Sequence, residues 1–324
     1  MEYHNNGNSK IIPTSDYIRS LTYQLTGKTA VKITRFTTGF THYVYEVTTS
    51  NQDIIVVRLC RPELKSIFKR ALYWYPILQK KGVPLPELYS SSLETPFPIM
   101  ILDRLPGKDL GLIYKNLSFK TKKRLADEIH SIHTLVQTLP GATGFGYATS
   151  SEDPHLLNSW GEVLRANMQR SRKRIANIGE VPPEYFDLVR QVMDAHEHYL
   201  SKVEPIPFLD DTTTKNVIIH KNSISGIVDV DFIAYGDPLY AVALTRASLK
   251  FKGYDNTFTD YWTSLLKINT DQQKALHLYT SLFYLDFWSE KGQSFNKIAP
   301  IDIKENQLNR VKSLIREELS LFNN

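Results

Sequence analysis

Three oxygen-bearing side chains are spaced along one short stretch of the sequence in a way that suits metal and phosphate chemistry. Asp211, Asn216 and Asp229 all lie within FLDDTTTKNVIIHKNSISGIVDVDF, residues 208–232. Carboxylates are costly to bring near a core unless something compensates their charge. Mg²⁺ prefers oxygen ligands and is commonly held by one or two carboxylates together with substrate phosphates. The segment therefore predicts a magnesium–phosphate site, although turn-capping residues at a polar hairpin end give a similar pattern.

The runs NVIIH and ISGIVD within this segment are rich in β-branched residues and predict a hairpin. A two-residue turn at Asn222-Ser223 suits asparagine, which tolerates the left-handed conformation. That turn sets a register in which Asn216 faces Asp229 at the open end of the hairpin. Asp211 precedes Asn216 in a polar loop, so we expect the three side chains to converge.

The elements around this hairpin divide the chain into two parts. The first part has strand-like runs, and a helix opening near Pro62 and closing at Gly82 follows the third of them; the strands are expected at 31–36, 43–47, 54–59, 83–89 and 97–105. From about residue 107 helical periodicity dominates; helices are expected near 118–139, 155–177, 183–203, 237–250, 254–268, 271–291 and 303–322. The sequence therefore predicts an α+β chain with a small β-rich N-terminal lobe and a larger, mostly helical C-terminal lobe, divided as 1–104 and 105–324.

The motifs LDDTTTKN, IVDVDF and YGDPLY occur in that order and spacing. They resemble the H-G-D-x-x-x-x-N, I-D-W and G-D-P motifs of the aminoglycoside phosphotransferase and choline kinase-like family, small-molecule kinases with a protein-kinase-like bilobal fold. FTTGFTHYVYEV, VVRL, GVPLPELY and MILDRLPGKDL resemble the nucleotide loop, the third strand, the strand after the helix and the lobe connection. The resemblance covers roughly residues 30–250.

The resemblance implies a role for each residue of the hairpin site. Asp211 matches the catalytic base, which orients and deprotonates the acceptor hydroxyl while the γ-phosphoryl group transfers. Asn216 and Asp229 match the Mg²⁺ ligands. Asp231 lies on the same strand face as Asp229 and is either a further ligand or a supporting residue. Asp237 is expected to cap the next helix.

The resemblance also implies a nucleotide site in the N-terminal lobe, with ATP or GTP as the phosphoryl donor. Its expected contacts are the nucleotide loop, the phosphate-binding side chain of the third strand and the lobe connection: Thr38, Gly39, Thr41, Arg58, Asp103, Arg104 and Leu105.

Several positions depart from the family pattern. Leu209 stands in place of the histidine before the catalytic aspartate, and Arg58 in place of the third-strand lysine. Arginine keeps the charge but is not equivalent to lysine at a tight site. The glutamate that pairs with this lysine has no obvious counterpart, because its slot falls near Arg70-Ala71; Glu63 is a candidate substitute. These departures leave open a pseudokinase that binds nucleotide or ligand without turnover.

One late segment, LYTSLFYLDFWSEKG (residues 278–292), combines acids with aromatic residues. Asp286 and Glu290 are one helical turn apart, with Trp288 close by. Such a set suits a cationic substrate through charge pairing and cation–π contacts. An amphipathic core helix with a charged outer face gives the same letters, and its periodicity favours that interpretation.

Composition limits the other function classes. The chain has 324 residues and a formal net charge of +5 with mixed acids and bases, and no basic run with interleaved aromatics, so we expect no nucleic acid partner. The single cysteine, Cys60, forms no internal disulfide and favours a reducing, cytoplasmic location. We expect no membrane partner. Too few residues separate Asp229 from Asp237 for an activation loop, which disfavours a protein substrate. The sequence does not choose between an aminoglycoside, a choline-like or other amino-alcohol, and a sugar as acceptor, and it leaves the oligomeric state open.

Overall fold

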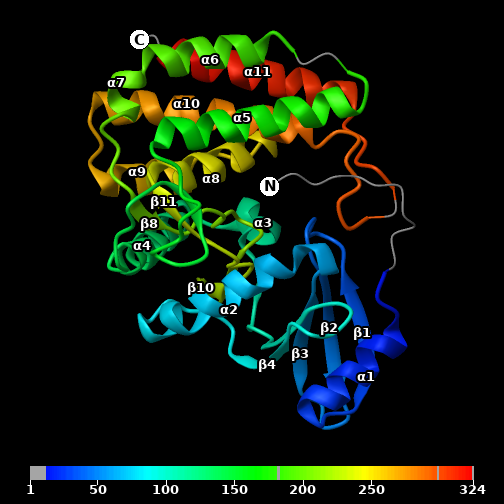
Figure 1. Cartoon of the computed structure of the whole chain (residues 1–324). Coiled ribbons are helices and arrows are strands. Elements are labelled where there is room, and N and C mark those ends of the chain that lie inside the picture. The colour runs from blue at the N-terminus through cyan, green and yellow to red at the C-terminus, as the bar shows by residue number, and fades with distance from the viewer. Residues whose placement is uncertain (1–11, 181–182, 298, 323–324) are drawn as a thin grey trace.

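The computed structural model describes residues 12–180, 183–297 and 299–322. A five-stranded antiparallel sheet of order β1-β2-β3-β5-β4 forms the N-terminal part, and a helical layer forms most of the C-terminal part (Figure 1). The strands of the first sheet are β1 (Ala30–Phe36), β2 (Tyr43–Thr49), β3 (Ile54–Leu59), β4 (Leu88–Ser92) and β5 (Ile99–Asp103). This arrangement confirms the predicted α+β, protein-kinase-like fold class.

Two helices accompany the first sheet. These are α1 (Ser15–Thr26), which the sequence analysis missed, and α2 (Lys65–Lys80), which follows a short 3-10 turn at Pro62–Leu64. Pro76 lies inside α2 without ending it. The helix α1 contributes Ile18 and Leu21 to a core with the inner faces of β1, β2 and β3. A second cluster, between β3, β5 and α2, fixes α2 across the sheet.

The remaining elements belong to the C-terminal part. The helices are α3 (Leu110–Ile113), a 3-10 turn at Tyr114–Asn116, α4 (Phe119–Val136), α5 (Trp160–Asn177), α6 (Tyr185–Ala195), α7 (Glu197–Leu200), α8 (Leu239–Phe251), α9 (Thr257–Leu266), α10 (Thr270–Ser289) and α11 (Glu305–Phe322). The strands are β6 (Lys108–Asp109), β7 (Gly146–Ala148), β8 (Ile206–Phe208), β9 (Val217–His220), β10 (Ser223–Ile227) and β11 (Ile233–Gly236). They form two small three-stranded sheets, β10-β9-β6 and β7-β11-β8.

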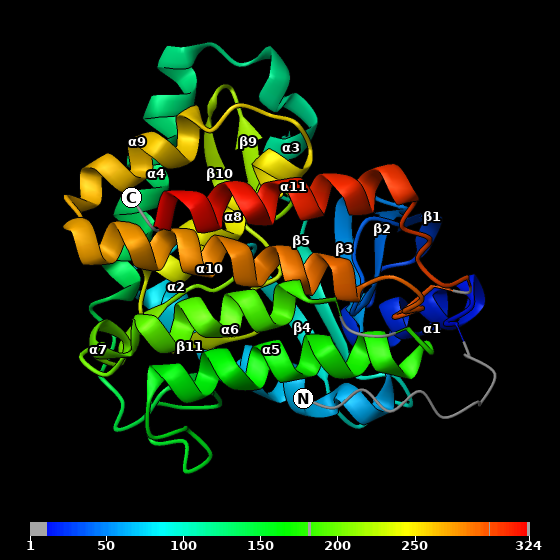
Figure 2. The same ribbon diagram turned by 90° about the horizontal axis from the view of Figure 1, so that it is seen from above.

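The helices α5, α6, α10 and α11 lie side by side in both views, with α8 on the other side of α10 (Figures 1 and 2). The helix α10 is buried on almost every face, because it packs against α5, α6, α8 and α11. Asp237 accepts a hydrogen bond from the backbone N–H of Leu239 at 3.0 Å, as expected for a residue that caps α8. No helix among the described residues has the length and apolar character needed to span a membrane.

The predicted hairpin exists, but its turn lies one residue earlier than predicted. Lys221 and Asn222, with φ angles of 48° and 67°, form the turn, so Ser223 pairs with His220. Two left-handed residues match the turn type that suits the twist of short hairpins. A bulge between Ile224 and Gly226 then shifts the register by one. Isolated turn residues could not reveal this bulge.

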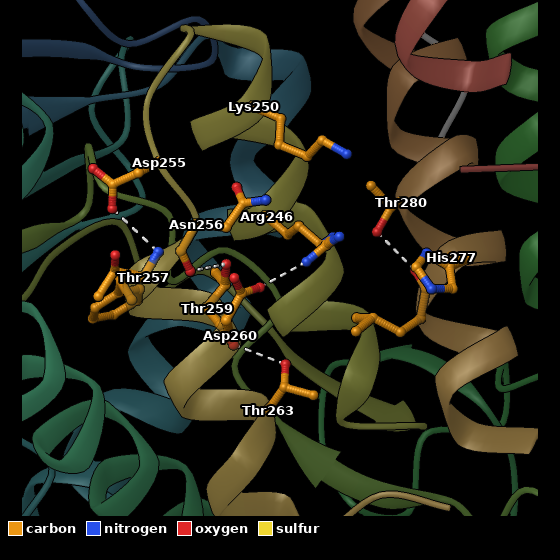
Figure 3. A network of polar contacts seen from close by, with 12 residues as sticks. Arg246, Lys250, Asp255, Asn256, Thr257, Thr259, Asp260, Thr263, His277 and Thr280 are labelled. Carbon is orange, nitrogen blue, oxygen red and sulfur yellow. Dashed lines mark hydrogen bonds and ion pairs between the residues drawn. The ribbon is translucent and has the colours of Figure 1, made fainter. Parts of the chain in front are cut away.

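A buried glutamate on the last helix, α11, contacts basic residues of two other helices. Glu318 on α11 is fully buried, and its carboxylate contacts Lys250 of α8 and, at 2.6 Å, His277 of α10. Arg246 of α8 lies 3.7 Å from the same carboxylate and also pairs with Asp260 of α9 at 2.9 Å. Arg246 and Lys250 project from α8 toward the side on which His277 lies (Figure 3). Four helices therefore meet at one cluster of charges.

Candidate active site

A large cavity of about 1040 Å³ lies beside the loop between β8 and β9. Its walls come from the nucleotide loop, α2, α5, α8, α10 and the chain around α3 and β7. The charged side chains that line it are Arg70, Asp109, Arg170, Arg174, Asp210, Asp211, Lys215, Lys252, Asp286, Glu290 and Asp302. Aromatic rings, including Tyr147, Phe232 and Tyr240, form much of the rest. Acids and bases are thus mixed in a cavity that also contains several aromatic rings.

Asp211 is held in place by its own loop. Its carboxylate accepts a hydrogen bond from the Thr213 hydroxyl at 2.8 Å and pairs with the Lys215 ammonium at 3.2 Å. Asp211 raises the pKa of Lys215 above its usual value, because the carboxylate stabilises the charged ammonium. The neighbouring Thr212 contacts His133 of α4, whose Nε2 lies 3.0 Å from the Thr212 hydroxyl oxygen. Burial lowers the pKa of His133 to about 3, so this histidine is neutral.

Asn216 and Asp229 come together with Asp211, as the sequence predicts, although not through the predicted pairing. Asn216 is buried, and its side-chain Nδ2 donates to the backbone carbonyl of Asp211 at 3.0 Å. The backbone carbonyl of Asn216 accepts a hydrogen bond from the backbone N–H of Val228 at 2.9 Å. Asp229 is therefore the residue after the partner of Asn216. It has a φ of 64°, and its side chain is 36% exposed. A non-glycine residue in this region of backbone space often marks a functional site.

Arg58 lies between Asp229 and Asp231 and contacts both carboxylates. Its guanidinium donates to Asp231 in a fork, with Nη1–Oδ1 and Nη2–Oδ2 distances of 2.7 and 2.8 Å, and Nη2 also contacts Asp229. Arg58 and Asp231 are both buried. His42 adds a third contact, with its Nε2 2.8 Å from Asp231 Oδ2. Although burial opposes ionisation, Arg58 and His42 hold the pKa of Asp231 well below its usual value. The suggested substitute for the helix glutamate was wrong, because Glu63 instead pairs with Arg61 at 3.3 Å.

The residues present fit a divalent cation that prefers oxygen. The Asn216 amide nitrogen is used by the loop, which leaves its oxygen for a ligand, and Asp229 offers a half-exposed carboxylate. Among the described residues, His42, Asp229 and Asp231 also bring potential ligand atoms within 4.8 Å of one another. The guanidinium of Arg58 already contacts both carboxylates of that group, so a cation there competes with it.

The α10 residues separate into two faces. Asp286 and Glu290 line the cavity. Trp288 does not reach it and is buried beside Tyr185, with ring centroids 6.0 Å apart. This is the core packing that the periodicity favoured. The structure therefore brings two of the three predicted α10 residues to the site.

The two acids differ in their surroundings. Asp286 accepts from the Ser171 hydroxyl at 2.7 Å and pairs with Arg174 at 3.1 Å and Arg170 at 3.5 Å. These arginines lower its pKa, although burial opposes them. Burial and the nearby Asp286 raise the pKa of Glu290 to about 7. Glu290 is therefore the cavity acid on α10 whose charge is not already compensated by two arginines.

Asp210 is a cavity residue that the sequence analysis did not select. It adjoins Asp211 and lines the cavity, where the family motif has glycine. Burial, followed by repulsion from Asp211 and Asp231, raises its pKa to about 7. The doubled aspartate in LDD is visible in the sequence, but the D-x-x-x-x-N spacing indicates only the second of the two.

The predicted nucleotide contacts lie toward two ends of the N-terminal sheet, with the β1–β2 loop and Arg58 near one end and Asp103, opposite Ile55, at the other. Thr38 lines the cavity, and Gly39 and Thr41 share its loop between β1 and β2. A side chain at Gly39 would meet no atom within 4 Å, so space above this loop is open. The φ of Gly39 is not in the left-handed region, so local backbone geometry does not require glycine.

The lobe connection is anchored on both sides. Asp103 accepts from the Tyr89 hydroxyl at 3.3 Å, and Arg104 pairs with Glu46 at 2.9 Å. Leu105 is buried. Gly107, with a φ of 115°, passes so close to β9 that a Cβ would lie 2.1 Å from the Ile219 carbonyl oxygen. Glycine at this point therefore lets the connection lie directly against strand β9.

Comparison with known families supports this architecture. Residues 32–270 match the model of the phosphotransferase enzyme family, which covers more than half of the chain. The chain belongs to this family. The match includes the β1–β3 sheet, the lobe connection and the whole 208–232 segment, so the motifs used in the sequence analysis all lie within it.

Solved structures with the same fold are distant in sequence. A putative fructosamine-3-kinase from Thermobifida fusca has 16% identity and a TM-score of 0.63, with 94% of this chain and 100% of that chain covered. A thermostable mutant of aminoglycoside phosphotransferase APH(4)-Ia, in a ternary complex with AMP-PNP and hygromycin B, has 14% identity and a TM-score of 0.64, covering 94% and 97%. ADP-bound aminoglycoside phosphotransferase APH(2'')-Ib has 15% identity and a TM-score of 0.61, covering 95% and 99%. No curated protein sequence matches this chain significantly.

Proposed function

We propose that this chain is a Mg²⁺-dependent small-molecule kinase that moves the γ-phosphoryl group of ATP or GTP to a hydroxyl group of its substrate. The observation that carries the proposal is the convergence of Asp211, Asn216 and Asp229 beside a cavity of about 1040 Å³. Among the similar structures, the APH(4)-Ia mutant is a ternary complex with AMP-PNP and hygromycin B, and APH(2'')-Ib is bound to ADP. The membership of the phosphotransferase enzyme family agrees with this reaction class.

In this proposal Asp211 orients the acceptor hydroxyl and takes its proton. The Thr213 hydroxyl and Lys215 fix its carboxylate, so the base is positioned before the substrate arrives. Phosphoryl transfer depends on positioning and charge stabilisation more than on base strength. Lys215 is also a cation close to the position of transfer, where it can share the phosphate charge.

Asn216 and Asp229 are the proposed ligands of Mg²⁺, which would supply positive charge to neutralise the phosphates of the donor. Arg58 is the proposed partner of the donor phosphates, with Thr38, Gly39 and Thr41 above them. Asp103, Arg104 and Leu105 lie at the connection where the nucleotide base is expected to bind backbone groups. Residues 1–104 then form the nucleotide lobe and 105–324 the catalytic and substrate lobe, in a protein we expect in the cytoplasm.

The acceptor side of the cavity favours a substrate with few positive charges. Arg170 and Arg174 already neutralise Asp286, and Lys215 pairs with Asp211. A polycationic aminoglycoside suits a strongly acidic groove, which this mixture of acids and bases is not. We therefore place sugars and small amino-alcohols ahead of aminoglycosides.

A screen of hydroxyl compounds by ADP or GDP release tests the proposal. We expect acceptor-dependent release with at least one sugar or amino-alcohol in the presence of Mg²⁺, and none from Asp211→Asn. Release from Asp211→Asn at the parent rate would contradict the role of Asp211. Aminoglycosides belong in the screen as the class that we rank lower.

One observation favours an alternative function. Arg58 contacts Asp229, the proposed metal ligand, so a cation must compete with a guanidinium. A pseudokinase that binds nucleotide or ligand without turnover would keep this contact. Nucleotide binding without phosphorylation of any acceptor, together with insensitivity to Mg²⁺, would support that alternative.

A further inference from the structure

The guanidinium of Arg58 needs a fixed orientation to serve a phosphate, and helix α2 does not supply the usual partner. The two terminal nitrogens of Arg58 instead meet both oxygens of Asp231, at 2.7 and 2.8 Å. A two-point contact of this kind fixes the plane of the guanidinium as well as its position. Arginine has further N–H donors that remain for another anion, which a lysine in the same contact would not offer in a rigid fork.

Asp231 is itself fixed by His42. The Nε2 atom of His42 lies 2.8 Å from Asp231 Oδ2, and both residues are buried. The rings of His42 and Phe68 lie 4.9 Å apart, and the Arg58 guanidinium lies 5.3 Å from the centre of the same Phe68 ring. His42, Asp231 and Arg58 therefore form one packed unit against α2. His42 comes from the nucleotide loop, so the unit joins the two lobes.

A loop of the C-terminal lobe holds His42 from its other side. The Asn296 Nδ2 donates to the His42 carbonyl, and the Asn296 N–H donates to the Phe40 carbonyl at 3.0 Å. The Phe40 and Phe295 rings stack with centroids 5.3 Å apart. This loop follows α10 and descends from the helical layer toward β1 and β2 (Figure 1). The helix that carries Glu290 in the cavity is thus continuous with the loop that fixes the nucleotide loop.

We infer that Asp231 and His42 are positioning residues for Arg58, taking the place of the helix glutamate, and that Asn296 holds His42 in this arrangement. The inference rests on the proposed function, because it assigns Arg58 to the donor phosphates. Asp231 is then bound to Arg58 and His42 rather than to the metal. The donor site depends on a contact from the acceptor lobe at Asn296.

Calorimetric titration of the full chain with a nucleotide and its nucleoside separates positioning from general stability. The nucleotide is whichever of ATP or GTP binds in the presence of Mg²⁺, and the nucleoside is adenosine or guanosine. Asp231→Asn is expected to weaken nucleotide binding roughly 10- to 100-fold, the range for residues that orient the ligands of a metal site, and to leave nucleoside binding unchanged. His42→Phe keeps the ring beside Phe68 but removes the contact with Asp231, so it should act in the same direction.

Conservative variants sharpen the result. His42→Gln restores an N–H donor and should recover part of the affinity lost in His42→Phe. In an Arg58→Lys background, Asp231→Asn should add little, because the fork that it orients is already gone. Asn296→Ala should give the smallest loss of the series. Glu318→Gln is the matched control, since it alters another buried carboxylate held by a basic residue and a histidine, outside the cavity.

The outcomes are distinguishable. A parent protein that binds neither ATP nor GTP contradicts the proposed function, and the inference falls with it. A parent that binds nucleotide, with an unchanged ratio of nucleotide to nucleoside affinity in Asp231→Asn, overturns the positioning role alone. Equal losses of nucleotide and nucleoside affinity in Asp231→Asn also overturn it, because they indicate damage to the fold.

Discussion

Two buried carboxylates in this protein have almost the same partners and different surroundings. Asp231 is held by Arg58 and His42, and Glu318 by Lys250 and His277. The Asp231 cluster continues to Asp229, a half-exposed residue with a left-handed backbone at the edge of the β9–β10 hairpin.

The Glu318 cluster is enclosed where α8, α10 and α11 meet, and none of its carboxylate's partners lines the cavity. The partners of a buried charge therefore do not tell whether it serves function or packing. The position of the cluster does: the Asp231 cluster reaches Asp229 beside the loop of Asp211 and Asn216, and the Glu318 cluster does not. Variants on the cavity side should change binding and turnover, and variants in the enclosed cluster should change stability.

The largest expected effect is on the cavity side. Asp211→Asn keeps the size of the side chain but removes the proposed base, so turnover of a hydroxyl acceptor should fall roughly 10²- to 10⁴-fold. The melting temperature should change little, because Asp211 contacts only Thr213 and Lys215 through its carboxylate. Steady-state kinetics and thermal melts on the same preparation make the comparison. A large loss of stability would show instead that Asp211, like Glu318, mainly stabilises the fold.

The second-largest effect is expected on stability, in the Glu318 cluster. Glu318→Gln removes the buried carboxylate that pairs with the Lys250 ammonium, and breaking such a buried pair costs about 3–5 kcal/mol. Urea unfolding should report a lower free energy of unfolding with unchanged nucleotide affinity. Lost nucleotide affinity in a folded Glu318→Gln protein would break the contrast between the two regions.

The pH dependence of stability should have opposite signs in the two regions. Hydrogen bonding to His277 and the charges of Arg246 and Lys250 lower the pKa of Glu318, against the effect of burial. Its contribution to stability is present above the unfolded pKa near 4.5 and is lost as pH falls through its lower folded pKa. Asp210 has a folded pKa raised to about 7 from 3.8, so its contribution is present below pH 3.8 and is lost as pH rises through 7.

Asp210→Asn removes that loss, so the variant should melt at a higher temperature than the parent above pH 7. The difference should shrink as the pH is lowered toward 4. Melting curves across this range measure it, with Glu318→Gln as the variant that is destabilised where Asp210→Asn is stabilised. A pH-independent difference would show that Asp210 does not titrate near neutrality.

The smallest effect is expected at the surface. Lys28 and Asp53 pair at 2.9 Å, but their side chains are 34% and 50% exposed. Such pairs contribute about 0–1 kcal/mol, because water and salt screen them. Asp53→Asn should therefore lie within that range by urea unfolding and should leave nucleotide affinity unchanged. It sets the baseline against which both clusters are judged.

Much of the fold was predictable from local patterns. The β-branched runs gave β1, β2 and β3, and helical periodicity gave α4, α8, α9, α10 and α11 close to their observed bounds. Short elements such as β6 and β8 were missed, because two or three residues carry no period and form strands only through their tertiary partners. The pairing of Asn216 with Asp229 failed because the turn lies one residue earlier than predicted, and the bulge that follows makes up only part of that shift.

The site was predictable where chemistry depends on spacing and unpredictable where it depends on contacts across the chain. The D-x-x-x-x-N spacing indicated Asp211 and Asn216. The partner of Arg58 lies 173 residues away in Asp231 and could not be inferred from helix spacing, which suggested Glu63. Trp288 and Glu290 belong to one segment, yet only the structure assigns them to the core and to the cavity.

The central claim is that Asp229 serves a magnesium nucleotide site. Calorimetric titration of ATP and GTP, with and without Mg²⁺, into the parent and Asp229→Asn proteins tests it most directly. We predict that the parent binds at least one nucleotide in a Mg²⁺-dependent manner and that Asp229→Asn weakens this binding and abolishes its metal dependence. Binding of neither nucleotide by the parent, or metal-dependent binding that Asp229→Asn leaves unchanged, would contradict the account.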